Sequence, residues 1–285
     1  MPDDATTPYS MLPPPPPPAA PGPAPIRTGP TLTTAWLAVG SLAAVVGLLF
    51  GTLQVVGLLA HEEHDETVRV DDPAVAVLDV ASDGGAIEIV AGDVDAVLIY
   101  ARVSDGLIGT DFTQEVVGDR LQVRVKCAGL IVNTWCSATL RIVVPRDFEV
   151  EVRSRHDRVT LRGLAGRVDA ESGDGPVEAE ALSGATRLHS DNGSVRASRL
   201  RTDSIQADSA NGSVRLEFAS APLSAIARSD NGSVEVAVPR GDEGYAVDIS
   251  SDNGSTDSLV KADPDSERRI VATSNNGSVT VRYLD

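Results

Sequence analysis

The sequence contains few of the side chains that most often bind transition metals, with only two cysteines and four histidines among 285 residues. The histidines, at positions 61, 64, 156 and 189, share no ligand spacing, whereas a structural zinc site requires four closely placed ligands. We therefore predict no metal site and no cofactor. Positive charge is also scarce, because 24 Lys and Arg face 41 Asp and Glu. The net charge of −17 argues against nucleic acid or an anionic lipid surface as a partner.

The first 34 residues contain almost no apolar side chains that would build a core. Positions 13 to 18 are consecutive prolines, and further prolines follow at 21, 23, 25 and 30. Such a composition favours polyproline II conformation without a packed core. We predict a disordered arm that acts as a flexible spacer, with docking to an SH3 or WW groove as the alternative.

Residues 35–60 carry no charged side chain. About 20 apolar residues span a bilayer, so this run predicts a transmembrane helix. A cleaved signal peptide is the weaker interpretation, because the run is too long and does not end in a small-x-small site. Arg27 precedes the helix and places the N-terminus in the cytoplasm. Ala43, Gly47 and Gly51 form a small-residue seam that allows a weak homodimer.

A hexapeptide close to Ser-Asp-Asn-Gly-Ser-Val recurs through the C-terminal half. Its glycines are separated by 18 to 23 residues, and apolar residues alternate with polar ones on both sides. This alternation predicts two short strands per repeat, each with one buried face. Asp157 and Gly85 occupy the glycine place in two further repeats upstream, and a serine lies three residues before every one of these positions. The six repeated glycines are Gly175, Gly193, Gly212, Gly232, Gly254 and Gly277.

Two all-β folds are compatible with this pattern. Asn-Gly between alternating strands is typical of a type I′ hairpin, and a series of hairpins would give an antiparallel meander. We favour a β-solenoid, in which each repeat is one coil stacked about 4.8 Å from the next. Stacking explains why the same residues recur at one corner, with glycine, or Asp157, in a left-handed conformation. It also predicts a ladder of side-chain amides from Asn192, Asn211, Asn231, Asn253 and Asn276.

Between positions 89 and 150 the repeat is less regular. Residues 97–101, 121–125 and 140–144 still alternate as strands do, whereas 105–118 is predicted to be a long excursion. We expect irregular coils here that begin the stack and cap its apolar end. Thr256 and Ser258 also depart from the apolar pattern, so the sixth regular coil is expected to pack loosely.

The chain resembles the bacterial DUF4097 family, whose members are often labelled candidate adhesins. The resemblance covers roughly residues 75–285 and rests on the Val-Pro at 144–145 and on the Ser-x-x-Gly-x-Val corners. It implies a right-handed, single-stranded β-solenoid on the bacterial envelope, without established catalytic residues. The corners that carry the resemblance begin at Ser172, Ser190, Ser209, Ser229 and Ser274.

One polar row beside the predicted ladder is a candidate binding rung, formed by Asp191, Asp230 and Asp252. Turn chemistry alone accounts for aspartate before Asn-Gly. Calcium bridging between stacked aspartates is one alternative, and the acid-base pair of a polysaccharide-cleaving enzyme is another. The Asn-Gly-Ser triplets also match the N-glycosylation sequon, and the pattern does not separate this from a turn.

We predict four segments: a cytoplasmic arm (1–34), a membrane helix (35–60), a linker (61–74) and an extracellular solenoid (75–285). The expected function is non-enzymatic adhesion or binding at the cell envelope, with envelope-stress sensing as the alternative. A cell-wall or surface polymer is the expected partner in addition to the membrane.

The two cysteines, Cys127 and Cys136, flank a short loop between alternating runs, which outside the membrane is typical of a disulfide. Closing a loop of about ten residues stabilises the fold by roughly 2 to 3 kcal/mol according to chain entropy. Both thiols of the native protein should therefore resist alkylation until a reductant is added. Rapid labelling without reductant would show that the bridge is absent.

Overall fold

The computed structural model describes residues 62–105, 110–127, 137–242 and 244–284, together with Ala44 and Gly47. The predicted proline arm lies outside the described residues, and so does the predicted membrane helix apart from Ala44 and Gly47, which are helical. Among the described residues, no helix combines the length and apolar character needed to cross a bilayer. Cys136 is also outside this part of the chain, so the disulfide remains a prediction.

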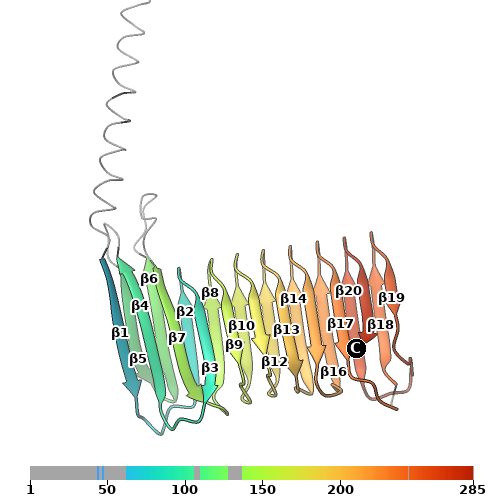
Figure 1. Ribbon diagram of the computed structural model, residues 1–285, viewed down its shortest axis with the longest axis horizontal. Coiled ribbons are helices and arrows are strands. Elements are labelled where there is room, and N and C mark those ends of the chain that lie inside the picture. Colours follow the sequence, from blue (N-terminus) through green and yellow to red (C-terminus); the bar gives the residue numbers. More distant parts are fainter. Residues whose placement is uncertain are drawn as a thin grey trace, which may run out of the picture. The chain divides into compact units, whose positions relative to one another are not determined.

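From Glu62 onward the described chain is all-β and forms two sheets (Figure 1). The first, sheet A, has 11 strands. In spatial order they are β1 (Glu62–Val70), β4 (Val97–Asp105), β7 (Ser137–Pro145), β3 (Ile87–Gly92), β9 (Val159–Arg162), β11 (Val177–Glu180), β13 (Val195–Leu200), β15 (Val214–Phe218), β17 (Val234–Val238), β21 (Val279–Tyr283) and β19 (Thr256–Ser258).

The second sheet, sheet B, has 10 strands and contributes the other half of each coil. In the same direction they are β5 (Thr110–Val117), β6 (Arg120–Cys127), β2 (Val77–Ser82), β8 (Glu149–Ser154), β10 (Val168–Ser172), β12 (Thr186–Ser190), β14 (Ser204–Ser209), β16 (Ser224–Ser229), β20 (Arg269–Ser274) and β18 (Ala246–Ser251).

Regular coils stack by parallel pairing of equivalent strands. In sheet B, β10 pairs in parallel with β8 on one side and β12 on the other, so Ser172 lies opposite both Ser154 and Ser190. In sheet A, β11 pairs in the same way with β9 and β13. A hairpin meander would join consecutive strands in antiparallel pairs. The observed pairing agrees with stacked, solenoid-like coils, and the meander is wrong.

The core consists of rows of small and branched apolar side chains between the two sheets. Alternate residues of each strand are buried, as in β12, where Leu188 is fully buried while Arg187 is exposed. Equivalent residues of successive coils form continuous rows, because the parallel register places Val195 beside Val214 and Val214 beside Val234. Each fully buried valine or leucine contributes about 1.5 to 3 kcal/mol relative to an exposed one. The alternation in the sequence therefore predicted the two-sided coil correctly.

The last two coils do not stack in chain order. After β17 the chain forms β18 and β19 at the end of the stack, and it then returns to insert β20 and β21 between them and β16 and β17. Thr256 and Ser258 belong to this terminal coil and are exposed. Their polarity follows from this position, because a terminal coil is covered by a neighbour on one side only.

The opposite end of the stack is capped by antiparallel strands. β1 pairs with β4, β4 pairs with β7, and β5 pairs with β6. The strands expected at 97–101, 121–125 and 140–144 are present as parts of β4, β6 and β7. Two expectations are wrong here: most of the supposed linker at 61–74 is β1, and the supposed excursion at 105–118 contains β5. β5 is an edge strand that is largely exposed, so its sequence lacks a clear apolar alternation.

Glycine is required at the corners because the backbones of adjacent coils touch there. A Cβ atom on Gly193, Gly212 or Gly232 would lie 2.2 to 2.3 Å from the carbonyl oxygen of the corner glycine in the preceding coil. The expected left-handed conformation is wrong, because the six repeated glycines and Asp157 are not among the described residues with positive φ. Among the described corner residues, only Gly85, with φ of 103°, has that conformation.

This contact predicts different costs for two glycine substitutions. Gly232→Ala should lower the free energy of unfolding by about 3 kcal/mol or more, because the new methyl group would overlap the Gly212 carbonyl oxygen. Gly241→Ala is the matched control, since no atom lies within 4 Å of its added Cβ. Ser233→Ala, one residue from the corner glycine and exposed, should also be nearly silent. Urea denaturation measures all three, and equal stability would contradict the close-contact explanation.

Candidate functional site

The serine ladder links the corners of successive coils through buried hydroxyl groups. Ser190 Oγ accepts the Gly193 N–H at 2.9 Å and donates to the Gly175 carbonyl of the preceding coil at 3.0 Å. Ser209 and Ser229 make the same pair of bonds at 2.8 to 2.9 Å. Each hydroxyl therefore satisfies two backbone groups that the turn leaves unpaired. The ladder consists of Ser172, Ser190, Ser209, Ser229, Ser274 and Ser251.

The predicted asparagine ladder is present on the exposed side of the same corner. Asn211 Nδ2 donates to Asn192 Oδ1 at 2.8 Å, and Asn231 Nδ2 donates to Asn211 Oδ1 at 2.9 Å. The next rung is Asn276, which donates to Asn231 at 2.9 Å, and Asn253 then donates to Asn276 at 3.0 Å. The order of the last two rungs follows the spatial order of the coils. Every carboxamide donates in the same direction along the stack.

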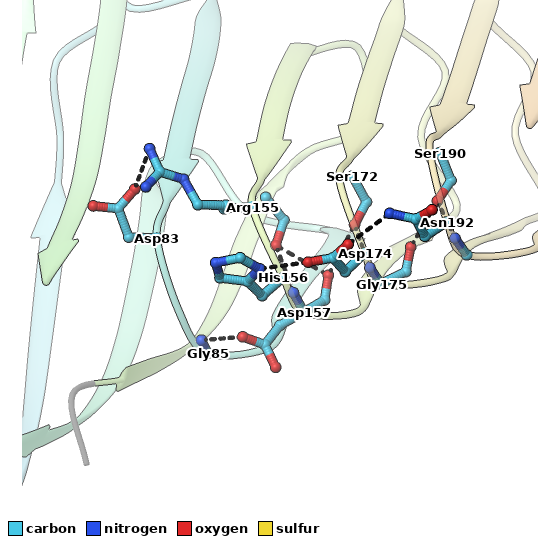
Figure 2. Close-up of polar contacts among 12 residues, drawn as sticks. Asp83, Gly85, Arg155, His156, Asp157, Ser172, Asp174, Gly175, Ser190 and Asn192 are labelled. Atoms are coloured by element: carbon cyan, nitrogen blue, oxygen red, sulfur yellow. Dashed lines mark hydrogen bonds and ion pairs between the residues drawn. The ribbon is translucent and has the colours of Figure 1, made fainter. Parts of the chain in front are cut away.

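An aspartate terminates the asparagine ladder where the regular coils begin (Figure 2). Asn192 Nδ2 donates to Asp174 Oδ1 at 2.7 Å, while His156 Nδ1 lies 2.6 Å from Asp174 Oδ2. A carboxylate suits this place because it offers only acceptors to the donors that face it. The hydrogen bond from His156, followed by that from Asn192, lowers the pKa of Asp174 below its ordinary value.

Next to His156, two contacts connect the regular coils to the coil of β2 and β3. Asp157 Oδ2 accepts the backbone N–H of Gly85 at 2.7 Å, although the two residues are 72 positions apart in the chain. Arg155, which is exposed, and Asp83, which is half-buried, form an ion pair at 3.4 Å (Figure 2). Asp157 thus replaces the corner glycine in the coil of β8 and β9, which stacks on the coil of β2 and β3.

The candidate binding rung is an interrupted row of exposed aspartates. In spatial order, Ala210 lies between Asp191 and Asp230, and Asn275 lies between Asp230 and Asp252. Consecutive aspartates are therefore two coils, or about 9.6 Å, apart. Asp191 accepts from His189 at 3.0 Å and Asp230 from Asn275 at 3.2 Å. The structure places the aspartates on one corner but does not bring them together.

This spacing bears on the calcium and glycosylation alternatives. Among the described residues, no three or more His, Cys, Asp or Glu side chains are grouped so as to hold a metal ion. Direct bridging of adjacent aspartates by calcium is not supported, because adjacent rungs do not both carry aspartate. Each sequon asparagine uses its Nδ2 atom in the ladder, and a glycan on that atom would place bulk between stacked coils.

A second polar feature was not predicted from the sequence. The outer face of sheet A carries a shallow groove of ≈ 330 Å³ lined by charged side chains, including Arg162, Glu178, Glu180, Arg196 and Arg215. Ion pairs cross this face from coil to coil, for example Arg162 to Glu180 at 3.3 Å and Arg215 to Glu235 at 2.8 Å. The signal was available in the outward positions three residues after the corner glycines, which carry Glu178, Arg196, Arg215 and Glu235 in four successive repeats.

Acid should break the end of the asparagine ladder at Asp174. The pKa of Asp174 is lower in the folded state, so its carboxylate stabilises the folded state at pH values above the ordinary aspartate pKa. This stabilisation is lost as the pH falls through the folded-state pKa. The side-chain amide protons of Asn192 should therefore shift in an NMR titration with a midpoint below about 3.9, the ordinary aspartate value. Asp174→Asn should abolish this shift. A midpoint at the ordinary value would contradict the assigned role of His156.

Comparisons with known proteins find one matching family and several similar solved structures. The family model described as Toastrack DUF4097 matches residues 62–283. A crystal structure of a candidate cell adhesion protein from Clostridium sporogenes is similar at 10% identity, with 78% of this chain and 100% of that chain covered and a TM-score of 0.40. A candidate adhesin from Bacteroides fragilis is similar at 15% identity, with 78% and 97% covered and a TM-score of 0.41.

A third similar structure, from Parabacteroides distasonis, is described as a candidate lipid-binding protein. It is 12% identical, with 79% of this chain and 97% of that chain covered and a TM-score of 0.27. Comparison with curated proteins gives no match. The match to the family model begins at β1 and ends in β21, so it includes the capping strands as well as the repeated coils. On the strength of that match, the chain belongs to the Toastrack DUF4097 family.

Proposed function

We propose that this protein is a non-enzymatic binding module at the cell envelope, which presents a right-handed solenoid outside the membrane on the helix predicted at 35–60. The right-handed winding is supported by the strong preference of parallel strand crossovers for that hand. The outward location is supported by Arg27 before the predicted helix, because basic residues flanking a membrane helix favour the cytoplasmic side. The N-terminal arm lies in the cytoplasm.

The observation that carries the binding function is the fixed pitch of exposed polar groups at one corner. The asparagine ladder fixes Asp191, Asp230 and Asp252 in a row with a repeat of about 9.6 Å. A regular row of carboxylates suits an extended polymer with regularly spaced hydroxyl or amino donors. Weak contacts at several rungs then add through multivalency. The ligand class is a cell-wall or surface polysaccharide, bound along the stack and not in a closed pocket.

Catalysis would require acid and base groups that converge on one bond. The aspartates of the candidate binding rung do not converge, because an intervening coil separates each from the next. The geometry therefore favours distributed contacts along the corner over turnover at a single place.

The triple variant Asp191→Asn, Asp230→Asn and Asp252→Asn tests this proposal. Asparagine also favours the turn, so the fold should persist while attachment of the protein to purified cell walls falls at least tenfold, or about 1.4 kcal/mol. Attachment is measured by co-sedimentation, with circular dichroism as the check on folding.

The matched control changes Asp93, Asp147 and Asp203 to Asn. These residues are exposed: Asp147 and Asp203 lie between a sheet A and a sheet B strand at the opposite corner, and Asp93 lies in the connection from β3 to β4. The control therefore alters net charge equally without touching the candidate binding rung. Full attachment of the control is expected. An equal loss of attachment in both variants would show that binding depends on net charge alone. Unchanged attachment of the Asp191, Asp230 and Asp252 variant would show that the candidate binding rung is not the site. If the unaltered protein released soluble sugar from the cell walls, and one of the three aspartate substitutions alone abolished this release, the protein would be an enzyme.

A further inference from the structure

Five Asn-Gly-Ser triplets occupy equivalent corners, yet the structure gives them different chemical environments. In an Asn-Gly pair, the backbone nitrogen of glycine is able to attack the side-chain carbonyl carbon of asparagine, because glycine offers little steric hindrance. The reacting Asn-Gly pair and the following serine are the same in all five triplets. Any difference in their reactivity therefore comes from the fold.

At three corners the attacking nitrogen is held by the serine ladder. The N–H groups of Gly193, Gly212 and Gly232 donate to Ser190, Ser209 and Ser229 at 2.8 to 2.9 Å. The accepting serines are buried and each donates to the preceding coil. Within the described part of the chain, the N–H groups of Gly254 and Gly277 have no such bond, so their nitrogens are less constrained.

The attacked carboxamide is also held less firmly at the end of the stack. Asn211, Asn231 and Asn276 each donate both to a neighbouring carboxamide and to a backbone carbonyl, and each accepts from the next rung. Among the described residues, the Asn253 side chain makes a single hydrogen bond, from its Nδ2 to Asn276. Its Oδ1 accepts from no described residue, because Asn253 is the last rung.

Solvent reaches the terminal corner more easily than the others. Residues Asp252 to Leu259 are all exposed, and this range includes Gly254, whereas Gly193 is buried. β19, which follows this corner, pairs with a neighbour on only one side. Local motion of an end coil costs fewer contacts than motion of an interior coil.

We propose that Asn253 is a site of spontaneous deamidation, at which the native fold permits a reaction that it suppresses at the other four triplets. The Gly254 backbone nitrogen loses its proton and bonds to Cγ of Asn253. The bond between Cγ and Nδ2 breaks, and the amide nitrogen leaves as ammonia. Water then opens the resulting succinimide ring, which gives either aspartate or isoaspartate at position 253.

The reaction changes the end of the stack in two ways. It removes the Nδ2 donor that binds Asn276 Oδ1, and it adds a carboxylate next to Asp252. Like charges at neighbouring positions repel each other, so the terminal coil becomes less stable as the protein ages. The interior rungs, whose hydrogen bonds do not depend on this residue, keep their geometry.

Peptide mapping by mass spectrometry tests the proposal on the full chain in detergent. The folded protein is incubated at mildly alkaline pH, and conversion is measured separately at Asn192, Asn211, Asn231, Asn253 and Asn276. The expected order is Asn253 first by several-fold, then Asn276, with the other three slowest. The same chain in denaturant should convert all five at similar rates, since each has glycine as the following residue. Conversion of Asn253 in the folded protein no faster than that of Asn211 would overturn the proposal.

A serine variant tests the cause of the protection. Ser209→Ala removes the acceptor of the Gly212 N–H and should accelerate conversion at Asn211 while Asn253 remains unchanged. The interior asparagines of unaltered coils, Asn192 among them, serve as internal references in the same digest. An unchanged rate at Asn211 in the folded variant would show that the serine ladder does not provide the protection.

Discussion

The structure depends on direct backbone contact between successive coils at one corner. The corner glycines lie so close to their neighbours that a Cβ atom would fall about 2.2 Å from a carbonyl oxygen. The corner segment from serine to glycine has the same length in all six repeats, whereas the distance from one glycine to the next serine grows from 15 to 20 residues. Variation in coil length is therefore accommodated after the sheet A strands, away from the ladders. A constant corner lets buried serines and exposed asparagines form continuous ladders over coils of unequal length.

The sequence predicted the coils and the composition of the corner because both depend on local patterns. Alternation around each Asn-Gly identified the inward residues, and the recurrence of asparagine identified the amide ladder. The same reasoning predicted the corner glycines correctly but attributed them to positive φ, whereas close contact between coils is the reason that glycine is required. Both constraints exclude other side chains, so the sequence alone does not distinguish them. The order of the strands along the chain also does not determine the order in which the coils stack. The insertion of β20 between β16 and β18 left only one indication in the sequence, the polar Thr256 and Ser258.

The two ends of the stack limit further strand pairing by different means. At one end, antiparallel β1 and β5 occupy the edges of the two sheets, and the acidic side chains of β1 make its free edge charged. At the other end, the inward positions of β19 are polar, so this coil offers little apolar surface to a further coil. β1 and β5 were not recognised from the sequence, because a strand covered on one side does not need the alternation of a core strand. Edge strands are thus the least predictable elements of this fold.

The direction of the asparagine ladder has a consequence for recognition. All carboxamides donate toward Asp174, where a carboxylate accepts the last donor, and hydrogen bonds aligned in this way polarise one another. Within the ladder, however, the interior amides already use their donors and acceptors on each other. The neighbouring aspartates retain unused acceptor capacity, since a carboxylate offers about four acceptor positions, and Asp191 and Asp230 each show a single side-chain donor. The ladder therefore fixes the spacing, while the candidate binding rung has the free acceptors that the proposed polymer ligand would require.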